Sequence, residues 1–134
     1  MGVGEAVIVA GIGCRKGASA AEIEAAITAA LERAGRPLAK LDVIATSSRK
    51  RHERAIKAAA KARGVALVFV DQADLETAGA RATTWSQRVL ALAGVPSVAE
   101  AAALAVAGPK SRLILPRIAA GPVTCALANA SVSP

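Results

Sequence analysis

The chain has 134 residues, and its 17 lysines and arginines exceed its 10 aspartates and glutamates, which gives a formal net charge of +7. This length fits one domain of ordinary size, so we expect residues 1–134 to form a single domain. Only Phe69 and Trp85 are aromatic, which excludes nucleic-acid binding by stacked bases, whereas the positive charge favours an anionic partner of another kind.

The first predicted elements lie on either side of a glycine-rich segment. The apolar run Ala6–Ala10 predicts a strand. Ser19 followed three residues later by Glu22 has the spacing of a capping box, and the apolar pattern after it predicts a helix over Ala20–Ala34. The segment between them is therefore expected to be a strand-to-helix turn.

That turn combines three glycines, Gly11, Gly13 and Gly17, with the cations Arg15 and Lys16. Glycines let a backbone approach a ligand closely, and N–H groups at a helix start attract negative charge, so we expect an anion site here. Two cations beside a positive helix end are unfavourable unless an anion is present. A purely structural turn is the alternative for the glycines alone. The spacing GxGxxxG differs from the dinucleotide pattern, and the Walker pattern is absent, so nucleotide binding stays an alternative.

Strand and helix patterns alternate along the rest of the chain. Strands are predicted at Val43–Thr46, Ala66–Val70, Arg112–Leu115 and Val123–Ala128, and helices at Lys50–Arg63, Trp85–Ala93 and Val98–Ala107. This order predicts an α/β fold of three α/β/α layers, with a mainly parallel or mixed sheet of about five strands whose last two strands form an antiparallel pair. The small polar stretch Thr77–Thr84 is the expected mobile loop.

Ligands of open α/β sheets bind beyond the carboxyl ends of the strands. Three segments are expected there, namely Gly11–Gly17, Ser47–Lys50 and Asp71–Asp74. Two of them carry cations and hydroxyls, so their convergence would form one cationic cleft. The cations between Arg49 and Arg63 also fit the alternative of a solvated helix face.

Several segments resemble one known family, formed by the cobalamin-biosynthesis protein CobE and the C-terminal domain of CbiG. The resemblance covers nearly the whole chain and rests most on GIGCRKGAS after the first strand and on GVPSVAEAAALAVAG, which includes Glu100. ATSSRKRHERAI, LVFVDQADL and PRIAAGPVTCALA are similar to weaker family segments. The chain departs from the family pattern at Ala18, Ala55 and Arg117, where threonine, glycine and lysine are usual.

The resemblance implies a role in assembling the corrin ring, and corrin precursors carry carboxylates around a flat, largely apolar macrocycle. Arg15, Lys16 and Lys50 are then expected to bind carboxylates, with Ser47 and Ser48 as neutral donors. Glu53 is expected to orient Lys50 or Arg49. The full predicted ligand-binding set is Gly11, Gly13, Cys14, Arg15, Lys16, Gly17, Ser47, Ser48, Lys50 and Glu53.

A catalytic alternative depends on Cys14, because a thiol at a helix start beside Arg15 is expected to have a lowered pKa. A small packed thiol is the other interpretation. His52 is the only histidine, and no triad follows from residue order. In two-domain relatives the lactone-opening step is assigned to the part that this chain lacks, which favours a binding or carrier role over hydrolysis.

We expect no cofactor and no metal site, since Cys14, His52 and Cys125 show no close ligand spacing. The expected partners are a corrinoid intermediate and other enzymes of the pathway, with neither nucleic acid nor membrane. No targeting segment is recognised, which makes the cytoplasm the expected location. Two cysteines are too few for a disulfide framework, so both are expected to be free thiols.

Overall fold

The computed structural model describes residues 7–37 and 40–130, so Ala6, the first residue of the first predicted strand, lies outside it. The strands are β1 (Val7–Cys14), β2 (Val43–Ser47), β3 (Ala66–Val70), β4 (Arg112–Ala120) and β5 (Val123–Ala130). They form one sheet in the order β3-β2-β1-β5-β4, in which β1, β2 and β3 are parallel and β5 is antiparallel to both of its neighbours. The predicted mixed sheet and the antiparallel last pair are confirmed.

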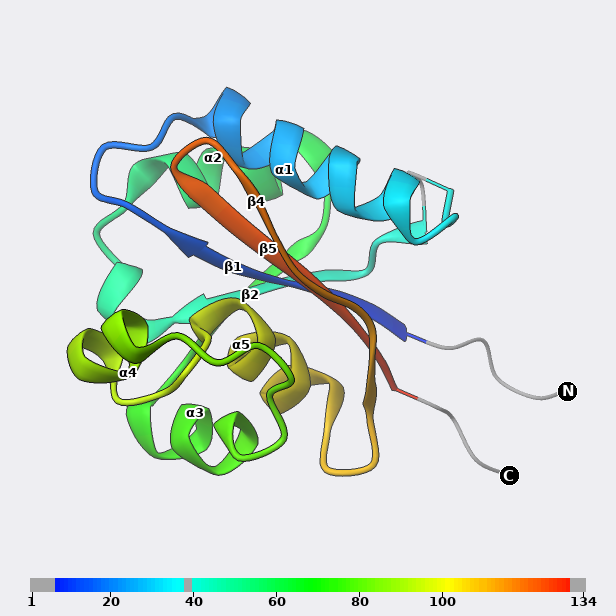
Figure 1. The fold of residues 1–134 in the computed structure, drawn as a ribbon. Coiled ribbons are helices and arrows are strands. Elements are labelled where there is room, and N and C mark those ends of the chain that lie inside the picture. Colours follow the sequence, from blue (N-terminus) through cyan, green and yellow to red (C-terminus); the bar gives the residue numbers. More distant parts are fainter. Residues whose placement is uncertain (1–6, 38–39, 131–134) are drawn as a thin grey trace, which may run out of the picture.

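Helices cover both faces of the sheet (Figure 1). They are α1 (Ala20–Arg33), α2 (Arg54–Arg63), α3 (Gln72–Gly79), α4 (Gln87–Ala93) and α5 (Val98–Ala107), with a short 3₁₀ turn η2 (Ser48–Lys50) after β2. One core lies between the sheet and α1 and α2, and a second core lies between the sheet and α3 and α5. These are the three α/β/α layers that the sequence predicts.

Helix α1 forms where its pattern predicts. The backbone N–H of Glu22 donates to Ser19 Oγ at 3.0 Å, and the N–H of Ser19 donates to Glu22 Oε1 at 2.9 Å, which completes the capping box. Ile23, Ile27 and Leu31 on one face are fully buried in the first core. On the outer side Arg63 of α2 pairs with Glu24 at 2.9 Å, which ties the two helices of this layer together.

The opposite layer contains α5, which consists mostly of alanine and packs its backbone against β1. A Cβ atom added at Gly11 would lie 1.8 Å from the carbonyl oxygen of Ala99, and one added at Gly13 would lie 2.6 Å from Thr124 Oγ1. Gly11 and Gly13 therefore belong to β1, not to the predicted turn. The physical reason for Gly11 is the close approach of α5 to β1, and for Gly13 it is the Thr124 side chain of the neighbouring strand; the φ angles of both are not positive, unlike that of Gly17 at +89°.

Three further predictions need correction. The predicted loop Thr77–Thr84 begins inside a helix, because α3 continues to Gly79, and Asp71 caps its start by accepting from the N–H of Asp74 at 2.9 Å. The predicted helix Lys50–Arg63 is divided into η2 and α2. Strand β4 continues past its predicted end at Leu115 and includes Pro116, because its register against β5 shifts at two places, between Leu113 and Leu115 and between Leu115 and Ile118.

Candidate functional site

A cleft of about 570 Å³ lies at the carboxyl end of β1. The loop after β1, the turn η2, the helix α4 and the turn between β4 and β5 form its walls. It is lined by Gly13, Cys14, Arg15, Ser47, Arg49, Lys50, Arg88, Val89, Leu92, Ala93, Val98, Arg117, Ala119, Gly121, Pro122 and Thr124. The convergence of the segments after β1 and β2 agrees with the expected position of a ligand site in an open α/β sheet.

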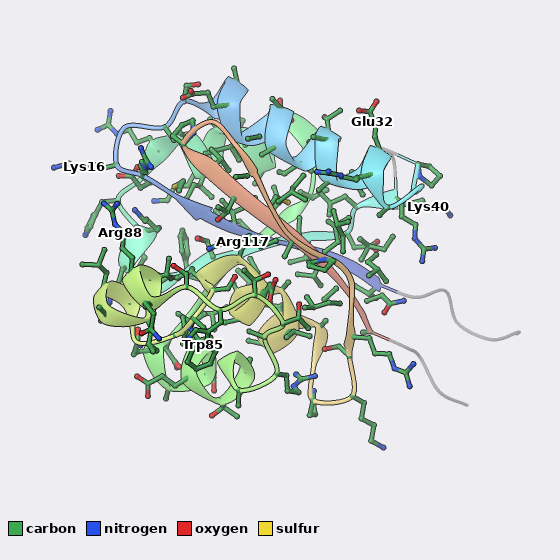
Figure 2. All side chains as sticks on the ribbon, in the orientation of Figure 1. Lys16, Glu32, Lys40, Trp85, Arg88 and Arg117 are labelled. Atoms are coloured by element: carbon green, nitrogen blue, oxygen red, sulfur yellow. The ribbon has the colours of Figure 1, made fainter. Side chains whose placement is uncertain are left out.

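Five of the lining side chains are cationic, and they come from four separate segments. Arg15 lies in the loop after β1, Arg49 and Lys50 lie in η2, Arg88 lies on α4 and Arg117 lies on β4. None of the lining residues, all within the described part of the chain, is an aspartate or a glutamate. Figure 2 shows Arg88 between α4 and the loop that carries Lys16, and Arg117 beside the strands. The cleft is therefore a site of concentrated positive charge.

The same cleft offers apolar surface beside these cations. Val89 and Leu92 from α4, Val98 from α5, and Ala119 and Pro122 from the hairpin line it. Leu92 is 70% exposed, so part of this apolar surface faces solvent. A ligand that fills the cleft would cover this surface, so the lining suits a molecule with an apolar body and an anionic periphery.

Backbone contacts fix the loop that carries Arg15. The N–H of Arg15 donates to the carbonyl of Pro122 at 3.0 Å, so the loop is attached to the turn between β4 and β5. The hydroxyl of Thr124 donates to the carbonyl of Gly13 at 3.2 Å. The Arg15 side chain is exposed, whereas its backbone is held from the far end of the chain.

Five of the ten predicted ligand-binding residues, Gly13, Cys14, Arg15, Ser47 and Lys50, line the cleft. The other five, Gly11, Lys16, Gly17, Ser48 and Glu53, do not. Gly11 is buried against α5, and Lys16 points away from the body of the protein at the tip of its loop (Figure 2). These two positions correct the prediction that the whole segment 11–17 faces one ligand.

The remaining expectations about this region also change in detail. At the N-terminus of α1 the carboxylate of Glu22 takes the N–H of Ser19, and the Ser19 hydroxyl takes the N–H of Glu22, so these two donors are not available to an anion. The Glu53 side chain forms no hydrogen bond or ion pair with Lys50 or Arg49 within the described residues; its backbone N–H donates to the carbonyl of Lys50 at 3.0 Å. Ser47 accepts from the N–H of Arg49 at 3.2 Å and so caps η2. Asp71–Asp74 form the start of α3 and do not line the cleft.

Cys14 is half-buried, and its pKa is raised, not lowered as the sequence suggested. Burial is the main cause, since it disfavours the thiolate; the nearby charge of Lys50 acts in the opposite direction, and Glu53 raises the pKa further. The sequence argument was wrong because Cys14 ends strand β1, six residues before α1 begins, and so does not lie at a helix start. Buried Cys125 has its pKa raised to about 12 by burial.

Sequence reasoning missed Arg88 and gave Arg117 no role in the site. Both lie far along the chain from the glycine-rich segment, and only the fold brings them to the cleft. The basic residue before the turn in PRIAAGPVTCALA was the available signal for Arg117, whereas nothing around Arg88 distinguishes it from a solvated helix residue. Within the described residues, no group of three His, Cys, Asp or Glu side chains could hold a metal.

No single helix among the described residues has the length and hydropathy of a membrane span. The pair α4 and α5 reaches those limits only when both are counted together across a 65° bend.

A three-layer α/β domain with a cationic, partly apolar cleft is the class of protein that these observations define. The family model described as the C-terminus of cobalamin synthesis protein G matches residues 8–128. The chain is 37% identical to protein CobE of Sinorhizobium sp over 122 residues, which cover 91% of this chain and 79% of that protein.

Solved structures agree with these sequence matches. A crystal structure of CobE, a protein from the cobalamin biosynthetic pathway, superposes with a TM-score of 0.91 at 32% identity and covers 98% of this chain and 96% of its own. The cobalamin biosynthesis protein ChiG of Agrobacterium tumefaciens gives 0.73 at 46% identity over 91% of this chain and 97% of its own. A cobalamin biosynthesis protein G homologue of Sulfolobus solfataricus gives 0.74 at 26% identity over 96% of this chain and 38% of its own.

This chain belongs to the CobE and CbiG C-terminal family, and it is a protein of the cobalamin-biosynthesis pathway.

Proposed function

We propose that the domain binds a polycarboxylated corrin intermediate reversibly in the cationic cleft and catalyses no reaction on it. The observation that carries this proposal is the convergence of five cations from four segments on a cleft that also has apolar walls. Corrin precursors match this lining, because acetate and propionate groups surround a flat, largely apolar macrocycle. The pathway supplies such molecules, and the cleft lacks the carboxylates that would repel them.

Each side of the cleft has a separate task in this proposal. The guanidinium groups of Arg15, Arg88 and Arg117 suit bidentate pairing with carboxylates, and Lys50 acts as a compact point charge. Val89 and Leu92 of α4 provide the apolar wall against which the macrocycle packs. Burial of this surface and the charge-assisted hydrogen bonds both contribute to affinity.

The chemistry of the cleft supports binding better than turnover. The raised pKa of Cys14 keeps its sulfur largely as the neutral thiol near pH 7, and the thiolate is the reactive form. His52 is exposed and does not line the cleft, so no imidazole is placed to act as a base for Cys14. A protein that binds without turnover would receive its ligand from one enzyme of the pathway and release it to another, which makes such enzymes its proposed partners.

Titration with matched ligands tests the proposal. We expect a metal-free corrin with free acetate and propionate groups to bind, and the same corrin with these groups converted to carboxamides to bind at least about tenfold more weakly, since the loss of one charge-assisted contact costs that much. The bound corrin should be recovered unchanged by chromatography. A new compound would establish an enzyme, and tight binding of ATP or NAD without corrin binding would support the nucleotide alternative.

Two neighbouring cations provide a matched pair of variants. Arg15→Ala should weaken binding of the corrin acid by about ten- to a hundredfold, because it removes a charge-assisted hydrogen bond. Lys16→Ala, one residue away and outside the cleft, should change it by less than about threefold. Cys14→Ser should also remain within about threefold; loss of pathway activity with binding intact would instead identify a reactive thiol.

A further inference from the structure

Glu100, on α5, is a fully buried carboxylate that takes no direct part in the cleft. Its exposed fraction is 0%, and within the described residues no lysine or arginine side chain pairs with it. A buried charge is costly unless neighbouring groups stabilise it. The contacts of Glu100 therefore indicate why the fold keeps a carboxylate at this position.

The two carboxylate oxygens of Glu100 join three segments of the chain. Oε1 accepts from the backbone N–H groups of Thr83 at 2.7 Å and Thr84 at 2.9 Å, and Oε2 accepts from the hydroxyl of Thr84. Oε2 also accepts from the backbone N–H of Arg117 at 2.9 Å. Helix α5, the loop before α4 and strand β4 are thus held at one point.

The backbone N–H of Arg117 bonds to Glu100 instead of to a neighbouring strand. The register between β4 and β5 shifts between Leu115 and Ile118, so Arg117 lies in an irregular part of the ladder. Its N–H is turned to Glu100, and its side chain lines the cleft. The carboxylate therefore stabilises the local backbone from which this cation reaches the site.

The hydrogen bonds from Thr83 and Thr84 to Glu100 stabilise the loop before α4 and so help to position that helix. None of the seven residues of α4, all of them described, is fully buried, so packing alone does not fix this helix. Polar contacts hold it instead: Arg49 donates to the carbonyl of Leu92 at 3.1 Å and Gln72 to that of Ala93 at 2.8 Å at one end. Thr84, held by Glu100, lies two residues before the N-cap Ser86 at the other end.

We propose that Glu100 is a positioning residue of the binding site, which sets Arg117 on β4 and Arg88 on α4 at the spacing that a polyanionic ligand requires. The inference rests on the proposed function for the identity of that ligand. A glutamine cannot replace Glu100, because both of its carboxylate oxygens face backbone N–H groups. Whichever way the amide is turned, its NH₂ group would oppose an N–H donor.

The first test needs no ligand. In Glu100→Gln, the backbone amides of Thr83, Thr84 or Arg117 should exchange hydrogen at least about tenfold faster than in the wild type, because one set of them loses its acceptor. The side-chain Nε–H resonances of Arg88 and Arg117 should also shift. Ser97→Ala is the matched control, since it removes the cap of the same helix and leaves the Glu100 carboxylate with its partners. In Ser97→Ala we expect the Nε–H resonances of Arg88 and Arg117 to be unchanged.

The second test measures binding of the metal-free corrin polycarboxylic acid. Glu100→Gln should weaken binding by about tenfold in the wild-type background and by less than about threefold when Arg88 and Arg117 are both alanine, because a positioning residue acts through those side chains. An equal loss in both backgrounds would mean that Glu100 only stabilises the fold, and it would overturn the inference.

The inference can still be tested if Glu100→Gln does not fold or if the wild type binds no corrin acid. If Glu100→Gln does not fold, Thr84→Val, which removes one donor and keeps the carboxylate, should produce the same changes in smaller measure, and their absence would overturn the inference. If the wild type binds no corrin acid, the proposed function fails. The Nε–H resonances of Arg88 and Arg117 then test the positioning role of Glu100 without a ligand. Unchanged resonances in both Glu100→Gln and Thr84→Val would overturn the inference.

Discussion

Helices α1 and α5 begin with the same pattern, a serine followed three residues later by a glutamate, yet the two glutamates behave differently. Glu22 turns back to the N–H of Ser19 and completes a capping box at the surface. Glu100 also follows a serine N-cap, Ser97, but its side chain leaves the helix start and binds the loop and strand beside it. The pattern predicts a helix start in both cases, and the surrounding donors decide where the carboxylate goes.

This difference extends to the layers around the two helices. The layer of α1 is stabilised by large aliphatic side chains, as shown by fully buried Ile23, Ile27 and Leu31. The layer of α5 also buries Leu75 and Leu104, but α5 itself is mostly alanine, lies in close backbone contact with Gly11 and carries a buried polar group, Glu100. The helices that line the cleft, α4 and α5, belong to this side of the sheet, so this wall of the site depends on polar contacts whose geometry is more exacting than that of apolar packing.

Replacing the two glutamates should separate these roles most strongly. Glu100→Ala leaves the backbone N–H groups of Thr83, Thr84 and Arg117 without this acceptor and should lower the free energy of unfolding by about 4 kcal/mol. Glu22→Ala removes one exposed cap contact and should cost about 0.5–1 kcal/mol. Denaturant unfolding of both variants measures the difference, and equal losses would contradict the comparison.

The close contact between α5 and β1 should be nearly as sensitive. In Gly11→Ala the new methyl would meet the backbone oxygen of Ala99, which cannot move without displacing the helix, so we expect a loss of about 3 kcal/mol. Gly64→Ala, at the αL C-cap of α2 with open space around it, should cost about 1 kcal/mol from backbone strain alone. Thermal unfolding of the pair tests this, and a mild Gly11→Ala variant would contradict close packing as the reason for the glycine.

The free energy of unfolding, measured as the pH is lowered, should reveal the lowered pKa of Glu100. Burial acts to raise its pKa, but hydrogen bonds from the backbone N–H groups of Arg117, Thr84 and Thr83 and from the Thr84 hydroxyl outweigh burial, so the pKa lies below the ordinary 4.5. The folded protein thus binds this proton less readily than the unfolded chain. The resulting stabilisation is present above pH 4.5 and is lost as the pH falls through the folded-state pKa. Glu100→Gln should therefore show a flatter decline of unfolding free energy in acid than the wild type, and identical declines would refute this assignment.

The smallest expected effect compares the two caps themselves. Ser19→Ala and Ser97→Ala each remove one hydroxyl that accepts from the N–H of the glutamate three residues on, at 3.0 and 3.2 Å. Each should cost about 1 kcal/mol of unfolding free energy. Corrin binding should be preserved in both. A much larger loss for Ser97→Ala would indicate that the cap also supports the contacts of Glu100.

The sequence predicted most elements of the fold because their periodicity and breakers are local. Helix α5 has the predicted bounds, Val98–Ala107, and β3 has the predicted bounds as well. The family resemblance implied only a short helix start in LVFVDQADL, and the continuation of α3 to Gly79 was missed because its eight residues carry little apolar periodicity. The end of β1 was missed because glycine is also a turn residue. In the last case the deciding contact, the backbone of Ala99, lies far along the chain.

The candidate site was only half predictable for the same reason. Arg15, Ser47 and Lys50 follow strands whose carboxyl ends must meet in a parallel sheet, so their convergence follows from local patterns. Arg88 and Arg117 reach the cleft through the placement of α4 and the irregular ladder of β4. The lowered pKa expected for Cys14 failed because burial, a property of the packed structure, outweighs neighbouring charge.

The pairing of β1 with β5 determines how this domain can be joined to others. Val7 pairs with Ala130 at one end of the two strands, and Cys14 pairs with Val123 at the other, beside the cleft. Over the eight residues of β1 the two ends lie roughly 23 Å apart. A domain joined at Val7 or at Ala130 would therefore be attached at the end of these strands away from the cleft. In the Sulfolobus structure the matching region is 38% of the chain, so in that protein this fold is joined to further chain.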